Sequence, residues 1–116
     1  VFLDAAIEFY KLFFIGLAKK RLHHAWIHCF AAVCVVTVGC LTGLSVMEWI
    51  AVIFAIGMVL AAEAVNSSIE ALADLVSPDY NEAIKRTKDL AAGAVLILAI
   101  AAAIVGLLIF IPKFLN

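Results

Sequence analysis

Residues 47–75 read MEWIAVIFAIGMVLAAEAVNSSIEALADL, an apolar run that passes into a polar segment with no helix breaker between them. A helix needs roughly 20 residues to cross a hydrocarbon core of about 30 Å, and the whole segment 47–75, at 29 residues, exceeds that length. Glu48 suits a helix start and Trp49 an interfacial anchor. Ser77 and Pro78 then interrupt the pattern, because proline disfavours helical geometry at the preceding residue. We therefore expect one helix over residues 47–75 that crosses a membrane and extends beyond it.

The composition of the whole chain indicates that lipid is its solvent. Its 116 residues are 67% hydrophobic, and the mean hydropathy is +1.19. A soluble domain of this size cannot bury so many apolar side chains. The net charge of -1 argues against nucleic acid as a partner, because phosphate binding needs a basic surface. We expect an integral membrane protein with no nucleic-acid partner.

Two further apolar runs flank this helix. Residues 26–46 form the first expected span, and Gly39, Gly43 and Ser45 loosen its far end into a short turn. Residues 90–111 form the third expected span, which Pro112 should end. The predicted fold is a single all-α membrane domain over residues 1–116 with three transmembrane helices.

Residues 1–24 mix apolar and charged side chains. We expect an N-terminal amphipathic surface helix here, with Phe9 and Phe13 in lipid and Lys11 and Lys19 among anionic head groups. A fourth span is disfavoured because charges at the bilayer centre are costly. Residues 1–14 also lack the basic start and the cleavage site of a signal peptide.

The basic residues beside the predicted spans indicate an orientation. Four precede span one: Lys11, Lys19, Lys20 and Arg21. Three lie between spans two and three, Lys85, Arg86 and Lys88, and Lys113 alone lies on the opposite side. The positive-inside rule places the N-terminal helix and the loop 77–89 in the cytoplasm.

A polar stripe follows one face of the second predicted helix. Positions 63, 66, 67, 70 and 74 recur at helical spacing and carry three carboxylates, an amide and a hydroxyl. Glu63 should lie deepest in the membrane and Asp74 nearest to water. Asn66, Ser67 and Ser68 could also serve only as hydrogen-bond partners between helices. An ionisable residue inside a span nevertheless indicates a functional site by default.

Two acids placed in this way can divide the chemistry of phosphoryl transfer. Glu63 beside lipid could accept a proton from a hydroxyl, and Glu70 nearer to water could hold Mg²⁺. The following loop supplies Lys85, Arg86 and Lys88 to neutralise phosphate oxygens, and Tyr80 could stack on a base. The sequence contains no Walker-type or kinase glycine-rich motif, so a nucleotide site would have another design. A second hypothesis is a non-catalytic assembly in which Glu63 and Glu70 ring a proton or cation path.

The run EAVNSSIEALADLVSPDYNEAIKRTKDLAAGAVL, residues 63–96, resembles the prokaryotic diacylglycerol kinase family, which includes the undecaprenol kinases. The resemblance depends on an E-x-x-N-S-x-I-E-x-x-x-D core, on Tyr80, and on Lys88-Asp89 followed by AAGA. The segment SVMEW, residues 45–49, looks more like the undecaprenol kinase branch. The similarity covers residues 45–112 and is weaker upstream.

This resemblance implies a homotrimer in the bacterial inner membrane, with active sites at subunit interfaces. The implied reaction transfers the γ-phosphate of MgATP to a lipid alcohol, undecaprenol or diacylglycerol. Glu63 would be the general base and Glu70 a metal ligand that also contacts the nucleotide. Five further residues would contact the nucleotide: Asp79, Tyr80, Asn81, Lys88 and Asp89. Two others would support the site: Asn66 and Asp74.

The chain departs from the family pattern at one position. The family carries a second metal-binding glutamate just before the first span, and Leu22 occupies that place here. Arg21, His23 and His24 surround it. Metal binding could therefore differ, with His23 or His24 assisting, or activity could be weak, or the chain could be an inactive member that serves as a subunit or scaffold.

Overall fold

The computed structural model describes residues 1–18 and 23–115. This part of the chain contains four α-helices and no strand: α1 (Phe2–Ala18), α2 (His23–Thr42), α3 (Val46–Val76) and α4 (Glu82–Leu115). The prediction of an all-α fold is confirmed. The prediction for the second helix, residues 47–75, differs from α3 by one residue at each end.

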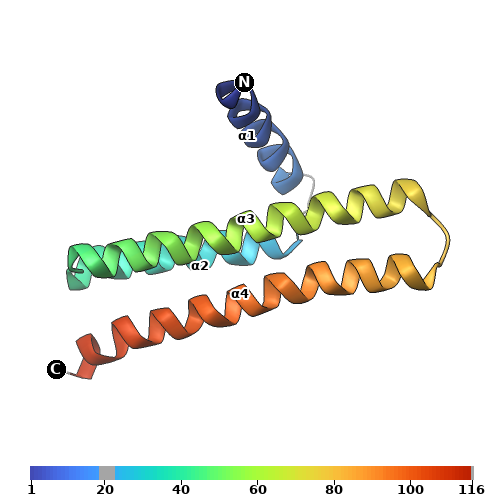
Figure 1. Cartoon of the computed structure of the whole chain (residues 1–116). Coiled ribbons are helices and arrows are strands. Elements are labelled where there is room, and N and C mark those ends of the chain that lie inside the picture. Colours follow the sequence, from blue (N-terminus) through green and yellow to red (C-terminus); the bar gives the residue numbers. More distant parts are fainter. Residues whose placement is uncertain (19–22, 116) are drawn as a thin grey trace.

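The helices α2, α3 and α4 run lengthwise beside one another, and α1 projects away from them (Figure 1). The connection 77–81 lies at one end of α3 and α4, the turn 43–45 and the C-terminus lie at the other, and α2 begins partway along the pair. α2 has 20 residues, whereas α3 has 31 and α4 has 34. α3 and α4 therefore continue as a pair beyond the start of α2, toward the connection 77–81.

Most of the apolar surface of these helices is uncovered. α3 and α4 are long and apolar enough to cross a membrane, and residues Trp26–Thr42 form a shorter apolar helix. The buried apolar side chains among the described residues are few: Val52, Val59, Ala73 and Val95. Lipid or other protein surfaces must cover the remaining apolar faces, because water would not. The three-span topology stays a prediction.

The turn between α2 and α3 ends the first apolar helix earlier than expected. α2 stops at Thr42 rather than at residue 46, because Gly43 adopts a positive φ of 76° that terminates the helix. Gly39 lies within α2, where an added Cβ would be 2.9 Å from Leu44 Cδ1 and 3.0 Å from the Trp49 ring. A side chain at this position would therefore disturb the packing of the turn.

Ser45 begins α3 through a capping box. Its hydroxyl accepts a hydrogen bond from the Glu48 backbone N–H at 3.2 Å, and the Glu48 carboxylate accepts one from the Ser45 N–H at 3.0 Å. These bonds satisfy two backbone donors that the first turn of a helix leaves without partners. The Glu48 carboxylate also lies 3.1 Å from Lys113 Nζ near the end of α4.

We expect Ser45→Ala to destabilise the protein by about 1 kcal/mol, because alanine cannot cap the first turn of α3. Thermal unfolding in detergent measures the effect. The matched control is Thr42→Ala, whose hydroxyl donates only to the Val38 carbonyl one turn back. Equal unfolding temperatures of the two variants would contradict the capping role.

α4 is longer than predicted at both ends. It begins at Glu82 rather than residue 90, because the Asn81 side chain caps it and two ion pairs at i,i+4 spacing stabilise the first turns: Lys85 with Asp89 and Arg86 with Glu82. It also continues through Pro112 to Leu115, so the expectation that Pro112 ends the helix is wrong. A proline in the last turns removes one backbone donor, and few helical residues follow it.

The N-terminal segment differs from the predicted helix over residues 1–24. α1 ends at Ala18, and His23 and His24 belong to the start of α2. Two predictions concern residues outside the described part of the chain: Lys19, Lys20, Arg21 and Leu22. The first three contribute to the predicted orientation, and Leu22 occupies the place of the family's glutamate.

Candidate functional site

The polar stripe of α3 becomes more exposed toward the connection 77–81. Glu63 is 2% exposed and Asn66 is 6% exposed. Glu70 is half-buried, and the side chain of Asp74 is 65% exposed. Burial within the chain thus decreases along the stripe from Glu63 to Asp74, while the predicted depth of these residues in a membrane stays a prediction.

Glu63 faces a histidine of the neighbouring helix. His28 of α2 places its Nδ1 atom 3.6 Å from Glu63 Oε2, and both side chains are largely buried. Neither of these two atoms has a hydrogen-bond partner among the described residues. The buried carboxylate therefore has one basic neighbour, at a distance slightly longer than a hydrogen bond.

Asn66 and Glu70 form a second contact, one turn along the stripe. The Asn66 Nδ2 group donates a hydrogen bond to Glu70 Oε1 at 3.4 Å. The Asn66 Oδ1 atom is buried and has no hydrogen-bond partner in the described part of the chain. A carboxylate and an unsatisfied amide oxygen thus lie together on this face of α3.

At the exposed end of the stripe, an ion pair connects α3 to α4. Asp74 forms an ion pair with Lys88, and Lys85 Nζ lies 2.7 Å from Asp89 Oδ2. The predicted nucleotide contacts Lys88 and Asp89 therefore both lie on the first turns of α4. Each of them is paired within the chain.

The connection 77–81 holds the remaining predicted nucleotide residues. Asp79 and Tyr80 are exposed, and the Ser77 hydroxyl donates to the Asp79 carbonyl at 3.1 Å. The Asn81 side-chain oxygen accepts hydrogen bonds from Ala83 N–H at 2.9 Å and from Ile84 N–H at 3.3 Å. The side chain of Asn81 therefore has a structural task, the N-cap of α4, besides any contact with a nucleotide.

The polar side chains are spread along α3 and are not gathered at one point. Glu70 lies midway, seven residues after Glu63 and seven before Ser77, and Glu63 is eleven residues before Asp74. A helix rises about 1.5 Å per residue, so Glu63 lies roughly 16 Å along the axis from Asp74. The buried carboxylate of Glu63 therefore lies well away from the charged end of the α3–α4 pair.

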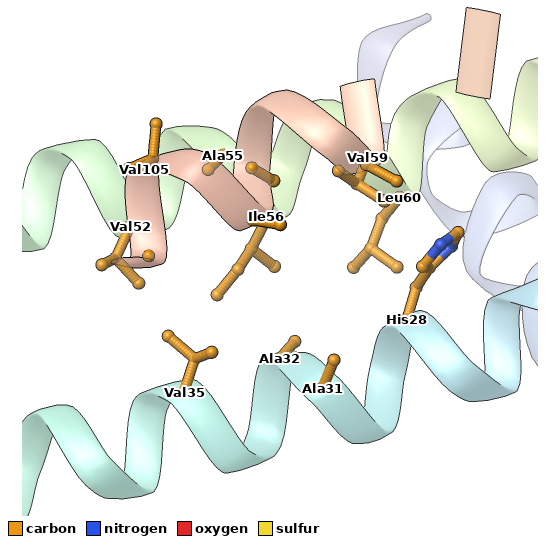
Figure 2. Close-up of a pocket in the computed structure, with 14 residues that line it drawn as sticks. His28, Ala31, Ala32, Val35, Val52, Ala55, Ile56, Val59, Leu60 and Val105 are labelled. Atoms are coloured by element: carbon orange, nitrogen blue, oxygen red, sulfur yellow. The ribbon is translucent and has the colours of Figure 1, made fainter. Parts of the chain in front are cut away.

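A groove of about 190 Å³ lies between α2, α3 and α4 beside the buried acid. Figure 2 shows the His28 ring at one end of it, near Val59 and Leu60, and Val35 and Val52 farther along. His28 is the one polar residue among those that line it. The groove is therefore apolar, and His28 at its end lies beside Glu63.

The oxygen ligands at Glu70 and Asn66 fit a hard cation. Mg²⁺ is usually held by one or two protein oxygens together with waters and substrate phosphates. The Glu70 carboxylate is partly exposed, and the buried Asn66 Oδ1 lacks a partner among the described residues. Groups of three or more His, Cys, Asp or Glu side chains at metal-binding distance are absent from residues 1–18 and 23–115.

Sequence reasoning did not identify His28 as part of the site. A histidine within an apolar helix is a signal in itself, because polar groups in a span are costly. Its partner, however, lies on another helix, and only the packing of α2 on α3 brings the two together.

Comparisons with known proteins agree with one another. A family model described as prokaryotic diacylglycerol kinase matches residues 15–110. An undecaprenol kinase of Bacillus subtilis is 41% identical over 86 residues, which cover 74% of this chain and 70% of that protein. A diacylglycerol kinase of Synechocystis sp. is 38% identical over 91 residues, 78% of this chain and 52% of the relative. A diacylglycerol kinase of Escherichia coli is 31% identical over 96 residues, 77% of this chain and 79% of the relative.

Proposed function

Since the chain belongs to the prokaryotic diacylglycerol kinase family, a family of membrane lipid kinases, we propose that it transfers the γ-phosphate of ATP to a lipid alcohol. The acceptor is undecaprenol or diacylglycerol, the lipids in the names of its relatives. The observation that supports this most directly is the exposure gradient along α3, from Glu63 at 2% to the exposed Asp74. The buried end, at Glu63, would receive the lipid hydroxyl, and the exposed end, at Asp74, would lie near the water-soluble nucleotide.

In this proposal Glu63 is the general base. The carboxylate accepts the proton of the lipid hydroxyl while the hydroxyl oxygen forms a bond to the γ-phosphorus. The bond between this phosphorus and the bridging oxygen breaks, and ADP leaves with that oxygen. The products are the lipid phosphate and ADP, and the proton remains on Glu63 until it is released.

The charged end of the α3–α4 pair would bind the nucleotide. Lys88 can neutralise phosphate oxygens by exchanging its contact with Asp74 for one with the nucleotide. Exposed Tyr80 can stack on the base. Asp79, Asn81 and Asp89 complete the set of proposed contacts.

Glu70 and Asn66 would hold Mg²⁺ through the carboxylate and the unpaired Oδ1 oxygen. When bound there, the ion supplies neutralisation of the phosphate charge. The hydrogen bond from Asn66 keeps the Glu70 carboxylate on the face of α3 that leads to Glu63. Asp74 would support the same face before the nucleotide binds, while it pairs with Lys88.

The proposed setting is the bacterial inner membrane. Three spans would leave the N-terminal helix and the region 77–89 on the cytoplasmic side, where ATP is available, in accordance with the basic residues beside them. The uncovered apolar faces of α2, α3 and α4 would be covered by lipid and by two further copies in a homotrimer.

A lipid kinase assay tests this proposal. Purified protein in mixed micelles receives labelled ATP, with undecaprenol in one set of reactions and diacylglycerol in another. We expect labelled lipid phosphate from one of them, and its loss when Mg²⁺ is chelated. Absence of product with both lipids would contradict the proposal. Nucleotide binding without turnover would indicate an inactive family member, and ion flux in liposomes that Glu63→Gln abolishes would indicate an ion path.

A further inference from the structure

We infer that His28 is a positioning residue for the Glu63 carboxylate. This inference rests on the proposed function, in which Glu63 accepts the proton of the lipid hydroxyl. The residue lies on α2, whereas all residues proposed above to carry the reaction lie on α3, on α4 or between them.

The geometry of the pair carries the inference. His28 Nδ1 lies 3.6 Å from Glu63 Oε2, and the Glu63 side chain is 3% exposed whereas that of His28 is 19% exposed. Both atoms are buried, and neither has another hydrogen-bond partner among the described residues. Figure 2 shows the His28 ring pointing from α2 toward α3, at the end of the groove.

The physical reason is the cost of an unpaired carboxylate in an apolar environment. Burial of an ionised carboxylate is costly unless a donor compensates it. A hydrogen bond from a ring N–H to a carboxylate has a length of about 2.7–3.2 Å, so a small rotation of either side chain closes the observed gap. With Oε2 held by His28, the other carboxylate oxygen can face the lipid hydroxyl.

His28 is suited to this task by its surroundings. Its companions along the groove are apolar and offer no competing acceptor. The residues one turn farther along α2 that line the groove are the small residues Ala31 and Ala32. Among the described residues, His28 is the basic side chain that reaches Glu63.

The test compares two substitutions that differ in one property. In His28→Asn the amide nitrogen occupies the place of Nδ1 and can still donate, whereas His28→Leu fills similar space without a donor. We expect His28→Leu to lower kcat by about 10- to 100-fold, the loss that corresponds to one hydrogen bond to a charged group. KM for ATP should change by less than about twofold, because the nucleotide residues lie elsewhere on α3 and α4. His28→Asn should restore most of the activity.

The control is Cys34→Ala, an exposed position on the same helix, which should leave kcat unchanged. An active wild type whose kcat is insensitive to His28→Leu would overturn the inference and leave the proposed function intact. Equal loss in the leucine and asparagine variants would also overturn it, because the donor would then be irrelevant. If the leucine variant does not fold in detergent, His28→Ala takes its place in the same comparison. An inactive wild type would instead contradict the proposed function.

Discussion

Replacement of Glu63 by glutamine is expected to lower lipid phosphorylation by about 10²–10⁴-fold, the range that a general base contributes. Glutamine has nearly the same shape, but its amide cannot accept the proton of the lipid hydroxyl. ATP affinity should change little, because Glu63 lies about 16 Å along α3 from the charged end of the helix pair. The stability of the variant should be close to that of the wild type, since an amide is less costly to bury than a carboxylate.

Single-turnover transfer and equilibrium binding of a non-hydrolysable ATP analogue, measured on the same preparation, separate the two effects. Ser68→Ala serves as the control on this helix, because the Ser68 side chain is exposed and donates only to the Ala64 carbonyl. Unchanged transfer by the glutamine variant would eliminate Glu63 as the base. Loss of analogue binding would show that Glu63 acts on the nucleotide instead.

Glu70→Gln should affect a different step. We expect Mg²⁺-dependent affinity for the nucleotide to fall by at least about tenfold, because loss of outer partners alone usually costs 10- to 100-fold in metal affinity and Glu70 would be a direct ligand. The fold of this region should be preserved, since the glutamine oxygen can still accept the hydrogen bond from Asn66. Transfer at saturating nucleotide and Mg²⁺ should fall less than in Glu63→Gln.

A titration of ATP binding at several Mg²⁺ concentrations measures this effect. Glu82→Gln is the matched control, because Glu82 lies at the exposed start of α4 and contacts Arg86 alone among the described residues. If Glu63→Gln and Glu70→Gln weakened nucleotide binding equally, the assignment of one acid to the base and the other to the metal would be wrong.

The sequence predicts α3 well because its limits depend on local signals. Ser45 and Glu48 cap the start. Pro78 disfavours helical geometry at Ser77, so the helix ends at Val76. The errors lie at the ends of α4, where a polar, charged start and a proline near the end resemble helix limits although local caps and i,i+4 pairs keep the helix intact. The early turns of α4 are held by side-chain pairs and by the Asn81 cap, and its last turn tolerates Pro112.

The candidate site divides in the same way. The spacing of Glu63, Asn66 and Glu70 places them on one face of any helix, so the stripe follows from the sequence. The contact of Glu63 with His28 depends on how α2 packs on α3, and that of Asp74 with Lys88 on how α3 packs on α4. No local pattern encodes such a pairing.

The two ion pairs between α3 and α4 also bear on how the protein without nucleotide should respond to its bilayer. Glu48 contacts Lys113 at one end of the pair, and Asp74 contacts Lys88 at the other. Glu48 and Asp74 are 26 residues apart on α3, and Lys88 and Lys113 are 25 residues apart on α4. At about 1.5 Å per residue, the two pairs lie roughly 39 Å apart. Sliding of one helix along the other would break both pairs at once. A thinner or thicker membrane should therefore tilt the two helices together as one rod, and the acids should keep their separation from the nucleotide end.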